Sequence, residues 1–188
     1  SDPENSEIIR STYRDIKLNP QEKIDVENYL FQCFEEFQQI PCKLLAKSWI
    51  KLIEPKKQTQ HPYKKGSESK PFWWPKECRH KEPDHLKKEE RIQLLIGMIR
   101  QFKHRSLEFI TAAELVCENQ TFENGKFKRT GHLSKRKLDI LFEMFKVLNC
   151  DKSVDEVSVI KPGKKYSSIV YTKKLISRKL QQKKHESL

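Results

Sequence analysis

The stretch Pro71–Arg91 reads PFWWPKECRHKEPDHLKKEER. A proline on either side of three adjacent aromatic residues does not allow a regular helix there, because proline lacks the backbone N–H group that a helix interior requires. Aromatic side chains bury large apolar areas, so we expect Phe72, Trp73 and Trp74 to anchor an extended segment on a hydrophobic core. The segment then leads into a helix whose first turns are rich in lysine.

This helix is predicted to begin near Pro83 and to run to about Phe102, since proline is common in the first turn of a helix. Its apolar residues recur at helical spacing: Leu86, Ile92, Leu95, Met98, Ile99 and Phe102. We expect Lys87, Lys88 and Arg91 to lie on the solvent side. They would stand near the helix N-terminus, where backbone N–H groups can also bind phosphate.

Further helices are predicted on both sides of this region. Apolar periodicity predicts one helix over residues 20–40 and another from Pro41 to just before Pro55. A short helix should start at Thr111, where the order Thr-Ala-Ala-Glu matches a capping box, and a longer one should cover residues 134–149. The sequence therefore predicts an all-α fold, a compact bundle of about five helices with long basic loops.

The predicted organisation has three parts. Residues 1–18 lack periodicity and are expected to form a flexible N-terminal arm. Residues 19–150 should form the helical domain, and residues 151–188 a basic C-terminal extension. Within that extension, Val157–Ile160 and Ser168–Tyr171 are compatible with a small hairpin, and Lys173–Lys184 with a basic helix.

Positive charge is concentrated in parts of the chain. The whole chain carries a net charge of +12. Residues 55–105 contain 14 basic and 6 acidic side chains, an excess of +8, whereas residues 1–54 contain 7 basic and 10 acidic ones, a net −3. A surface that binds a polyanion needs such clustering, because each neutralised phosphate releases counterions. The middle of the chain is therefore the predicted binding region.

Two basic loops are expected in this region. Residues 55–71 are rich in proline, lysine and serine without a periodic apolar face, and Lys126–Arg129 follow an Asn-Gly turn. Three basic residues, Lys135–Lys137, then open the last predicted helix. Cations early in a helix oppose its dipole, so an anion bound there would stabilise them.

The segment from Lys70 to about Lys103 resembles two families. Trp73-Trp74-Pro75, followed by a basic spacer and the order Lys-Glu-Pro-Asp-His-Leu-Lys-Lys at 81–88, is similar to the DNA-binding domain of the plant ethylene-insensitive transcription factors. Those domains carry Lys-Lys-Pro-His-Asp-Leu-Lys-Lys, so Glu82 replaces a lysine and the Asp84-His85 order is exchanged. A fungal helical-bundle domain from a subtelomeric gene cluster is more similar still.

The resemblance implies an all-helical fold and sequence-specific DNA binding in the nucleus. Carried over by position, it implies contacts to DNA backbone or bases from Lys76, Lys81, Lys87, Lys88 and Arg91. Sequence reasoning favours double-stranded DNA over RNA, because the aromatic residues cluster in one proline-bounded segment instead of forming stacking platforms on strands.

Several other functions have little support in the sequence. It contains no nucleotide-binding glycine loop and none of the hydrolase motifs, so we expect no enzyme and no cofactor. The five cysteines are widely spaced, which indicates neither a disulfide framework nor zinc. Cys78, His80 and His85, with His61 upstream, lack a fourth ligand at a recognisable spacing. No apolar run is long enough to cross a membrane.

We therefore expect a sequence-specific DNA-binding domain of a nuclear transcription regulator, with duplex DNA and other transcription proteins as partners. Its basic face would combine loops 55–82 and 126–132 with the start of the helix at 84–102. The predicted DNA-binding residues are Lys64, Lys65, Lys70, Lys76, Arg79, His80, Lys81, His85, Lys87, Lys88, Arg91, Lys126, Lys128, Arg129, Lys135 and Arg136. The alternative is a helical interaction module whose basic face binds an acidic protein.

Overall fold

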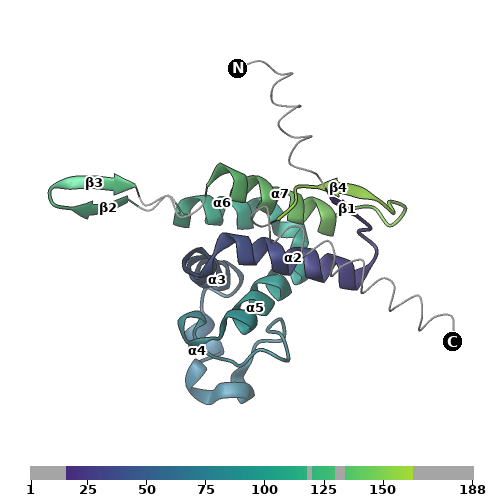
Figure 1. Cartoon of the computed structure of the whole chain (residues 1–188). Coiled ribbons are helices and arrows are strands. Elements are labelled where there is room, and N and C mark those ends of the chain that lie inside the picture. The colour runs from purple at the N-terminus through teal and green to yellow at the C-terminus, as the bar shows by residue number, and fades with distance from the viewer. Residues whose placement is uncertain (1–15, 118–119, 130–133, 163–188) are drawn as a thin grey trace. The chain divides into compact units, whose positions relative to one another are not determined.

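The computed structural model describes residues 16–117, 120–129 and 134–162, and they are mostly helical (Figure 1). They fall into two compact units. One consists of residues 16–36 and 150–162, and the other of the described residues between 37 and 149. An all-α bundle of about five helices was predicted from the sequence, and the mostly helical structure confirms this fold class.

The smaller unit contains a strand that sequence periodicity missed. Strand β1 (Ile16–Leu18) pairs antiparallel with β4 (Val157–Val159), with Ile16 opposite Val159. The side-chain amide of Gln21 donates hydrogen bonds to two backbone carbonyls just before β4, at 2.9 and 3.0 Å. The assignment of residues 16–18 to a flexible arm is therefore wrong, because three residues are too few for an alternating pattern to show.

Helix α2 (Lys23–Phe37) follows β1. Its buried face is built from Val26, Tyr29, Leu30, Cys33, Phe34 and Phe37. This spacing of three and four residues is that of one side of an α-helix. Gln38 adopts a positive φ of 69° between the end of α2 and the start of α3 (Gln39–Ile53). The predicted break near Pro41 thus occurs slightly earlier in the chain.

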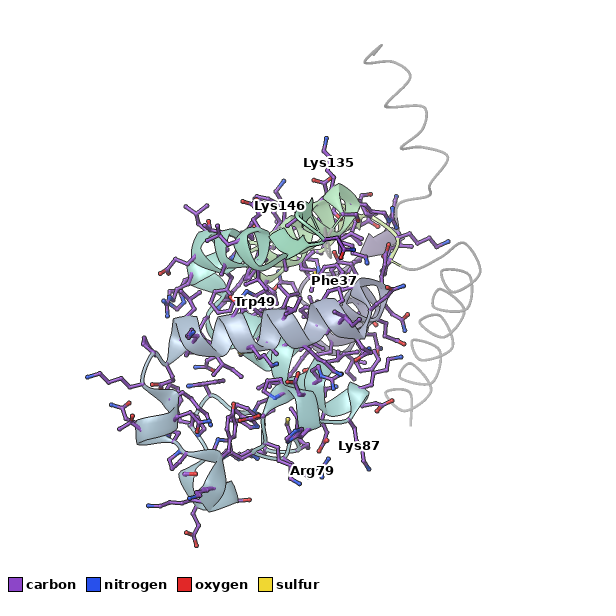
Figure 2. The ribbon with its side chains drawn as sticks, turned by 90° about the vertical axis from the view of Figure 1, so that its left-hand side faces the viewer. Phe37, Trp49, Arg79, Lys87, Lys135 and Lys146 are labelled. Atoms are coloured by element: carbon purple, nitrogen blue, oxygen red, sulfur yellow. The ribbon has the colours of Figure 1, made fainter. Side chains whose placement is uncertain are left out.

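The larger unit is arranged around α3. Helices α5 (Lys88–Gln101) and α6 (Ser106–Cys117) both pack against α3, and α7 (Lys135–Leu148) packs against α6. Trp49 of α3, labelled in Figure 2, is fully buried. Its indole Nε1 donates a hydrogen bond of 3.0 Å to the Phe109 carbonyl, and the two rings lie 5.1 Å apart.

The segment expected as an irregular loop contains short helical turns. Helix α4 (Lys57–Gln60) is followed by a 3-10 helix at Tyr63–Ser69, which is interrupted at Gly66. Another 3-10 helix covers Pro83–His85, so α5 begins at Lys88, later than the predicted start near Pro83. Proline marks the entry to this turn, and the chain becomes α-helical only after it.

Two other local predictions need correction. Thr111 lies inside α6, where its hydroxyl donates to the Leu107 carbonyl, so no capping box starts there. The second basic loop is a hairpin of β2 (Gln120–Glu123) and β3 (Lys126–Arg129). Its turn residues Asn124 and Gly125 both have positive φ, 53° and 73°, which suits the tightest hairpin turn.

The predicted helix over 134–149 is found as α7. The Ser134 hydroxyl caps it by accepting the Lys137 N–H at 3.3 Å, and Asn149 follows its last residue. The expected hairpin between Val157–Ile160 and Ser168–Tyr171 is replaced at 157–159 by pairing with β1. Its second half, together with the predicted helix at Lys173–Lys184, lies outside the described residues.

Candidate nucleic-acid interface

The predicted aromatic anchor lies in a segment that we call the Trp strap, residues 71–82. The side chains of Trp73 and Trp74 are buried, with ring centroids 5.6 Å apart. The Trp73 indole N–H donates to the carboxylate of Glu54 at 3.3 Å, and that of Trp74 donates to the Arg79 carbonyl at 3.2 Å. The Trp73 indole therefore ties the strap to the end of α3, while the Trp74 indole forms a bond within the strap itself.

Phe72 does not share this role, and its inclusion in the anchor is wrong. Its side chain is 82% exposed. The backbone N–H of Trp74 donates to the Pro71 carbonyl at 3.0 Å. This bond closes a β-turn in which Phe72 is the second of four residues. The turn carries Phe72 on its outside while the residues on either side are buried.

A glycine of α5 allows the strap to lie close to the helix. A Cβ atom at Gly97 would stand 2.8 Å from Cγ of Pro75, which is closer than real Cβ contacts. Only glycine therefore fits at position 97 without a shift of the proline ring. The sequence marked Pro75 as a chain breaker, but nothing in the helical pattern indicated that Gly97 receives it.

Cys78 belongs to the strap, and its side chain is buried. Its thiol contacts the carbonyl oxygens of Arg79 and Glu90 at 3.5 and 3.4 Å. Burial raises the pKa of this thiol to about 11, so it stays protonated at neutral pH. In the part of the chain that the structure describes, no three His, Cys, Asp or Glu side chains are grouped to hold a metal ion.

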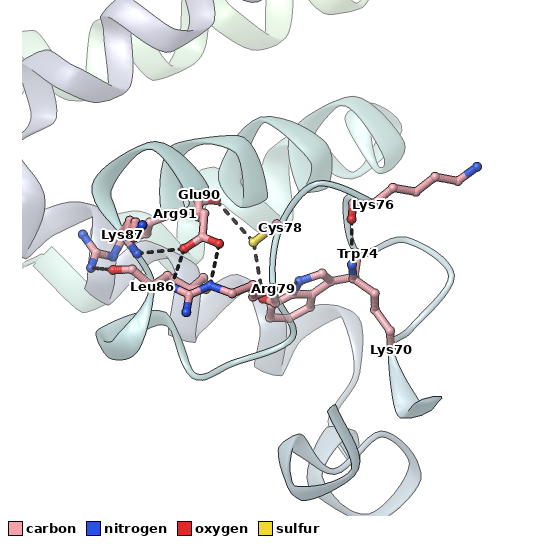
Figure 3. Close-up of polar contacts among 9 residues, drawn as sticks. All are labelled: Lys70, Trp74, Lys76, Cys78, Arg79, Leu86, Lys87, Glu90 and Arg91. Atoms are coloured by element: carbon pink, nitrogen blue, oxygen red, sulfur yellow. Dashed lines mark hydrogen bonds and ion pairs between the residues drawn. The ribbon is translucent and has the colours of Figure 1, made fainter. Parts of the chain in front are cut away.

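Arg79 lies in an ion pair with Glu90 (Figure 3). Glu90 also accepts the backbone N–H of Lys87 at 3.1 Å and so caps the N-terminus of α5. The hydrogen bonds from Arg79 are the main reason why the pKa of Glu90 falls to about 2. A protein carboxylate thus stands at the N-terminus of α5, where phosphate binding had been expected.

Arg91 is buried, so its predicted contact with DNA is wrong. Only 4% of its surface is exposed. The guanidinium donates to the backbone carbonyls of Pro83 and Leu86, at 2.9 and 2.7 Å, and to the side-chain oxygen of Gln39 at 2.6 Å. These bonds join the 3-10 turn, α5 and the start of α3.

His80 is also buried, at 4% exposure, and its prediction as a DNA contact is wrong as well. Its Nε2 lies 2.6 Å from the ammonium nitrogen of Lys57, and its Nδ1 lies 2.7 Å from the Gly66 carbonyl. Since a carbonyl only accepts, Nδ1 carries the proton and Nε2 accepts from Lys57. Burial is the first cause that lowers the pKa of His80.

Lys57, the partner of His80, was not predicted from the sequence as a residue of the site. Its ammonium group lies 3.1 Å from the centre of the Tyr63 ring and donates to the His61 carbonyl at 2.7 Å. Burial lowers the pKa of Lys57 to about 8, partly offset by the carboxylate of Glu82. No sequence pattern distinguishes this lysine from its exposed neighbours, because its partners come from three separate turns.

The other predicted residues of the middle segment are displayed more openly. Lys70 is half-buried and donates to the Lys76 carbonyl at 3.1 Å (Figure 3). Lys87 and Lys88 are exposed at the start of α5, and His85 is exposed in the preceding turn. Exposed side chains are also found at Lys64, Lys65, Lys76 and Lys81.

The second predicted basic segment spans the β2–β3 hairpin, labelled in Figure 1, and the start of α7. The side chains of Lys126, Lys128 and Arg129 are outside the described part, as are residues 130–133. Lys135 and Arg136 are exposed at the start of α7, whose first turn holds no acidic residue. That the two basic loops share one face stays a prediction.

Fold and site together define a helical bundle domain in which a tryptophan-anchored strap supports a lysine-rich segment. More particularly, the chain belongs to the family of YDR124W-like helical bundle domains, whose sequence profile matches residues 14–171. This is the fungal family of the sequence-based resemblance. None of the helices that the structure describes is long and apolar enough to cross a membrane.

One relative is a subtelomeric hrmA-associated cluster protein of Aspergillus fumigatus. It is 30% identical over 161 residues, which cover 72% of this chain and 28% of the relative. The chain thus spans less than a third of the length of that protein. No solved structure matches the chain. The resemblance to the plant ethylene-insensitive factors stays a prediction.

Proposed function

We propose that this domain binds double-stranded DNA with sequence preference and serves a nuclear transcription regulator. The observation that carries the proposal is a set of uncompensated lysines. Within the described residues, the ammonium groups of four exposed lysines make neither a hydrogen bond nor an ion pair: Lys64, Lys65, Lys76 and Lys81. Such groups can neutralise DNA phosphates and release their counterions.

The acidic residues of the middle segment, residues 55–105, neutralise only part of its positive charge. Two of its six carboxylates are engaged within the protein, since Glu90 pairs with Arg79 and Asp84 with Lys47. Arg79, the partner of Glu90, belongs to the same segment, so this pair also neutralises one of its positive charges. Lys47, the partner of Asp84, lies in α3 outside the segment. The segment therefore keeps an excess of positive charge, which supports a polyanionic partner.

Sequence preference requires contacts with base edges, and the structure narrows the candidates for them. Arg91 is buried, which leaves Lys87 and Lys88 as exposed residues at the start of α5. A lysine at the end of a helix can donate to guanine O6 and N7 in the major groove. Lys135, exposed at the start of α7, is suited to the phosphate backbone.

The proposal is tested by selecting binding sites from a random duplex DNA library. The test variant is Lys87→Ala/Lys88→Ala. The matched control, Lys146→Ala/Lys152→Ala, removes the same charge from exposed positions elsewhere. We expect the wild type and the control to enrich one motif that the test variant loses. A library that stays unenriched, with all three proteins released at the same moderate salt concentration, would contradict sequence-specific binding.

A second candidate function is an interaction module for an acidic protein. Helix α6 exposes Leu107 and Leu115, at 73% and 70%. They are eight residues apart and therefore on neighbouring sides of the helix, which is the kind of apolar surface that protein partners cover. This function predicts that Leu107→Ser/Leu115→Ser weakens capture of the acidic partner and that the wild type enriches no motif from the duplex DNA library.

A further inference from the structure

Phe72 is the most exposed of the large hydrophobic residues that the structure describes, at 82%. Exposure alone is ordinary for a surface residue. What distinguishes Phe72 is that its neighbours in the strap are fixed. Pro71, Trp73 and Trp74 are all buried, and the turn is closed by the hydrogen bond of 3.0 Å between Trp74 N–H and the Pro71 carbonyl.

The residues beside this turn are held by contacts with two helices. Trp73 is held through its bond to Glu54 at the end of α3, and Pro75 is seated against Gly97 of α5. A side chain displayed on such a base loses little further conformational freedom when it binds. Preorganised aromatic residues of this kind are effective contacts in recognition.

The surroundings of Phe72 in the strap are cationic. Lys70 precedes it by two residues and Lys76 follows it by four, and the Lys76 ammonium group has no partner within the described residues. An apolar side chain flanked by lysines fits a nucleic acid, because phosphates lie on both sides of the apolar faces of stacked bases.

We infer that Phe72 is a wedge that enters a base step of the bound duplex and kinks it. The inference rests on the proposed DNA binding. A groove for single-stranded nucleic acid stacks successive bases on several aromatic residues. Here Trp73 and Trp74 are buried and cannot contribute, so the strap offers one aromatic tip. A lone apolar tip beside phosphate contacts is the arrangement of proteins that partly unstack and bend a duplex.

The test uses the full chain and a duplex that carries the selected sequence, with donor and acceptor dyes at its ends. Binding of the wild type should raise energy transfer as the duplex bends. We expect Phe72→Ala to abolish this rise and to weaken binding about tenfold. The slope of affinity against salt concentration should stay unchanged, since no charge is lost. Phe72→Leu should keep the bend, because leucine also serves as a wedge.

Leu107→Ala is the matched control, since it removes a comparably exposed apolar side chain from α6. Energy transfer that is the same for wild type and Phe72→Ala overturns the wedge, while motif selection by the lysines still supports DNA binding. Tighter binding of the single-stranded form, lost in both Phe72→Ala and Phe72→Leu, also overturns it in favour of base stacking. A wild type that binds no duplex overturns the proposed function itself.

Discussion

Arg79 and Glu90 meet in a bidentate ion pair, with Nε donating to Oε1 at 2.8 Å and Nη2 to Oε2 at 2.9 Å. The pair joins the Trp strap to the first turn of α5, and Glu90 caps that turn as well (Figure 3). One carboxylate thus fixes both the strap and the start of the helix on which the proposed DNA contacts lie.

Glu90→Gln should make the protein less sensitive to acid. The pKa of Glu90 is lowered to about 2, whereas the same carboxyl has a pKa of about 4.5 in an unfolded chain. As the pH falls through this window, the unfolded chain takes up the proton first, so the folded wild type loses stability. Glutamine preserves the shape and carries no charge.

The expected observation is a wild type that is more stable than Glu90→Gln at neutral pH, with the difference vanishing near pH 2. Urea unfolding followed at several pH values measures it. A difference that stays constant from neutral pH down to pH 2 would show that the ion pair does not stabilise the fold.

Arg91→Met should destabilise the larger unit by about 2 kcal/mol, because two buried carbonyl oxygens and the half-buried Gln39 side chain lose the hydrogen bonds of the guanidinium. The methionine fills similar space but removes the donor of the Leu86 carbonyl and one of the two donors of the Pro83 carbonyl, which keeps only the Leu86 N–H at 3.3 Å. Denaturant unfolding provides the measurement, and Gln93→Met, at an exposed position on the same helix, is the control. Equal stability of the two variants would contradict the buried role of Arg91.

Gly97→Ala should destabilise the protein although alanine favours a helix by about 1 kcal/mol over glycine. The added Cβ would stand 2.8 Å from Pro75 Cγ, and the strap must move to accommodate it. Tryptophan fluorescence should shift to longer wavelength as Trp73 and Trp74 become more exposed to solvent. In the double variant with Pro75→Ala the clash is absent, so the change at 97 should become stabilising. The same effect in both backgrounds would rule out the contact.

Lys57→Met should remove a rise in stability at alkaline pH. The pKa of Lys57 is lowered to about 8, below its ordinary 10.5, so the unfolded chain binds more protons between these values. The wild type should therefore gain stability relative to Lys57→Met as the pH rises from 8 to 10.5. The comparison isolates this lysine from other groups that titrate there. A pH-independent difference between the two proteins would contradict the prediction.

Patterns along the sequence were sufficient where local interactions decide the structure. Helix α7 has both a serine cap at Ser134 and an amphipathic repeat, and its predicted limits agree with those observed. The burial of Trp73 and Trp74 follows from their size. Residues 57–69, by contrast, form short turns held by backbone hydrogen bonds, which leave no apolar period to detect.

The site was harder to predict, because burial of a polar group depends on partners distant in the sequence. Arg91 has the spacing of a solvent-facing residue, yet carbonyls from another turn and Gln39 surround it. Lys57 and His80 contact each other in the interior although they are 23 residues apart in the sequence. Phe72 was expected inside because it is apolar, and the geometry of its turn places it outside.

The pairing of β1 with β4 joins points about 140 residues apart in the chain, with Ile16 opposite Val159. Residues 16 and 159, which lie at and near the two ends of the described part of the domain, are therefore next to each other. A module with neighbouring entry and exit points can be carried within a surface loop of a host protein without separating the host's own flanking segments. For the same reason, a circular permutant should fold in which a short linker joins the ends of β1 and β4 and the new termini lie in an exposed turn.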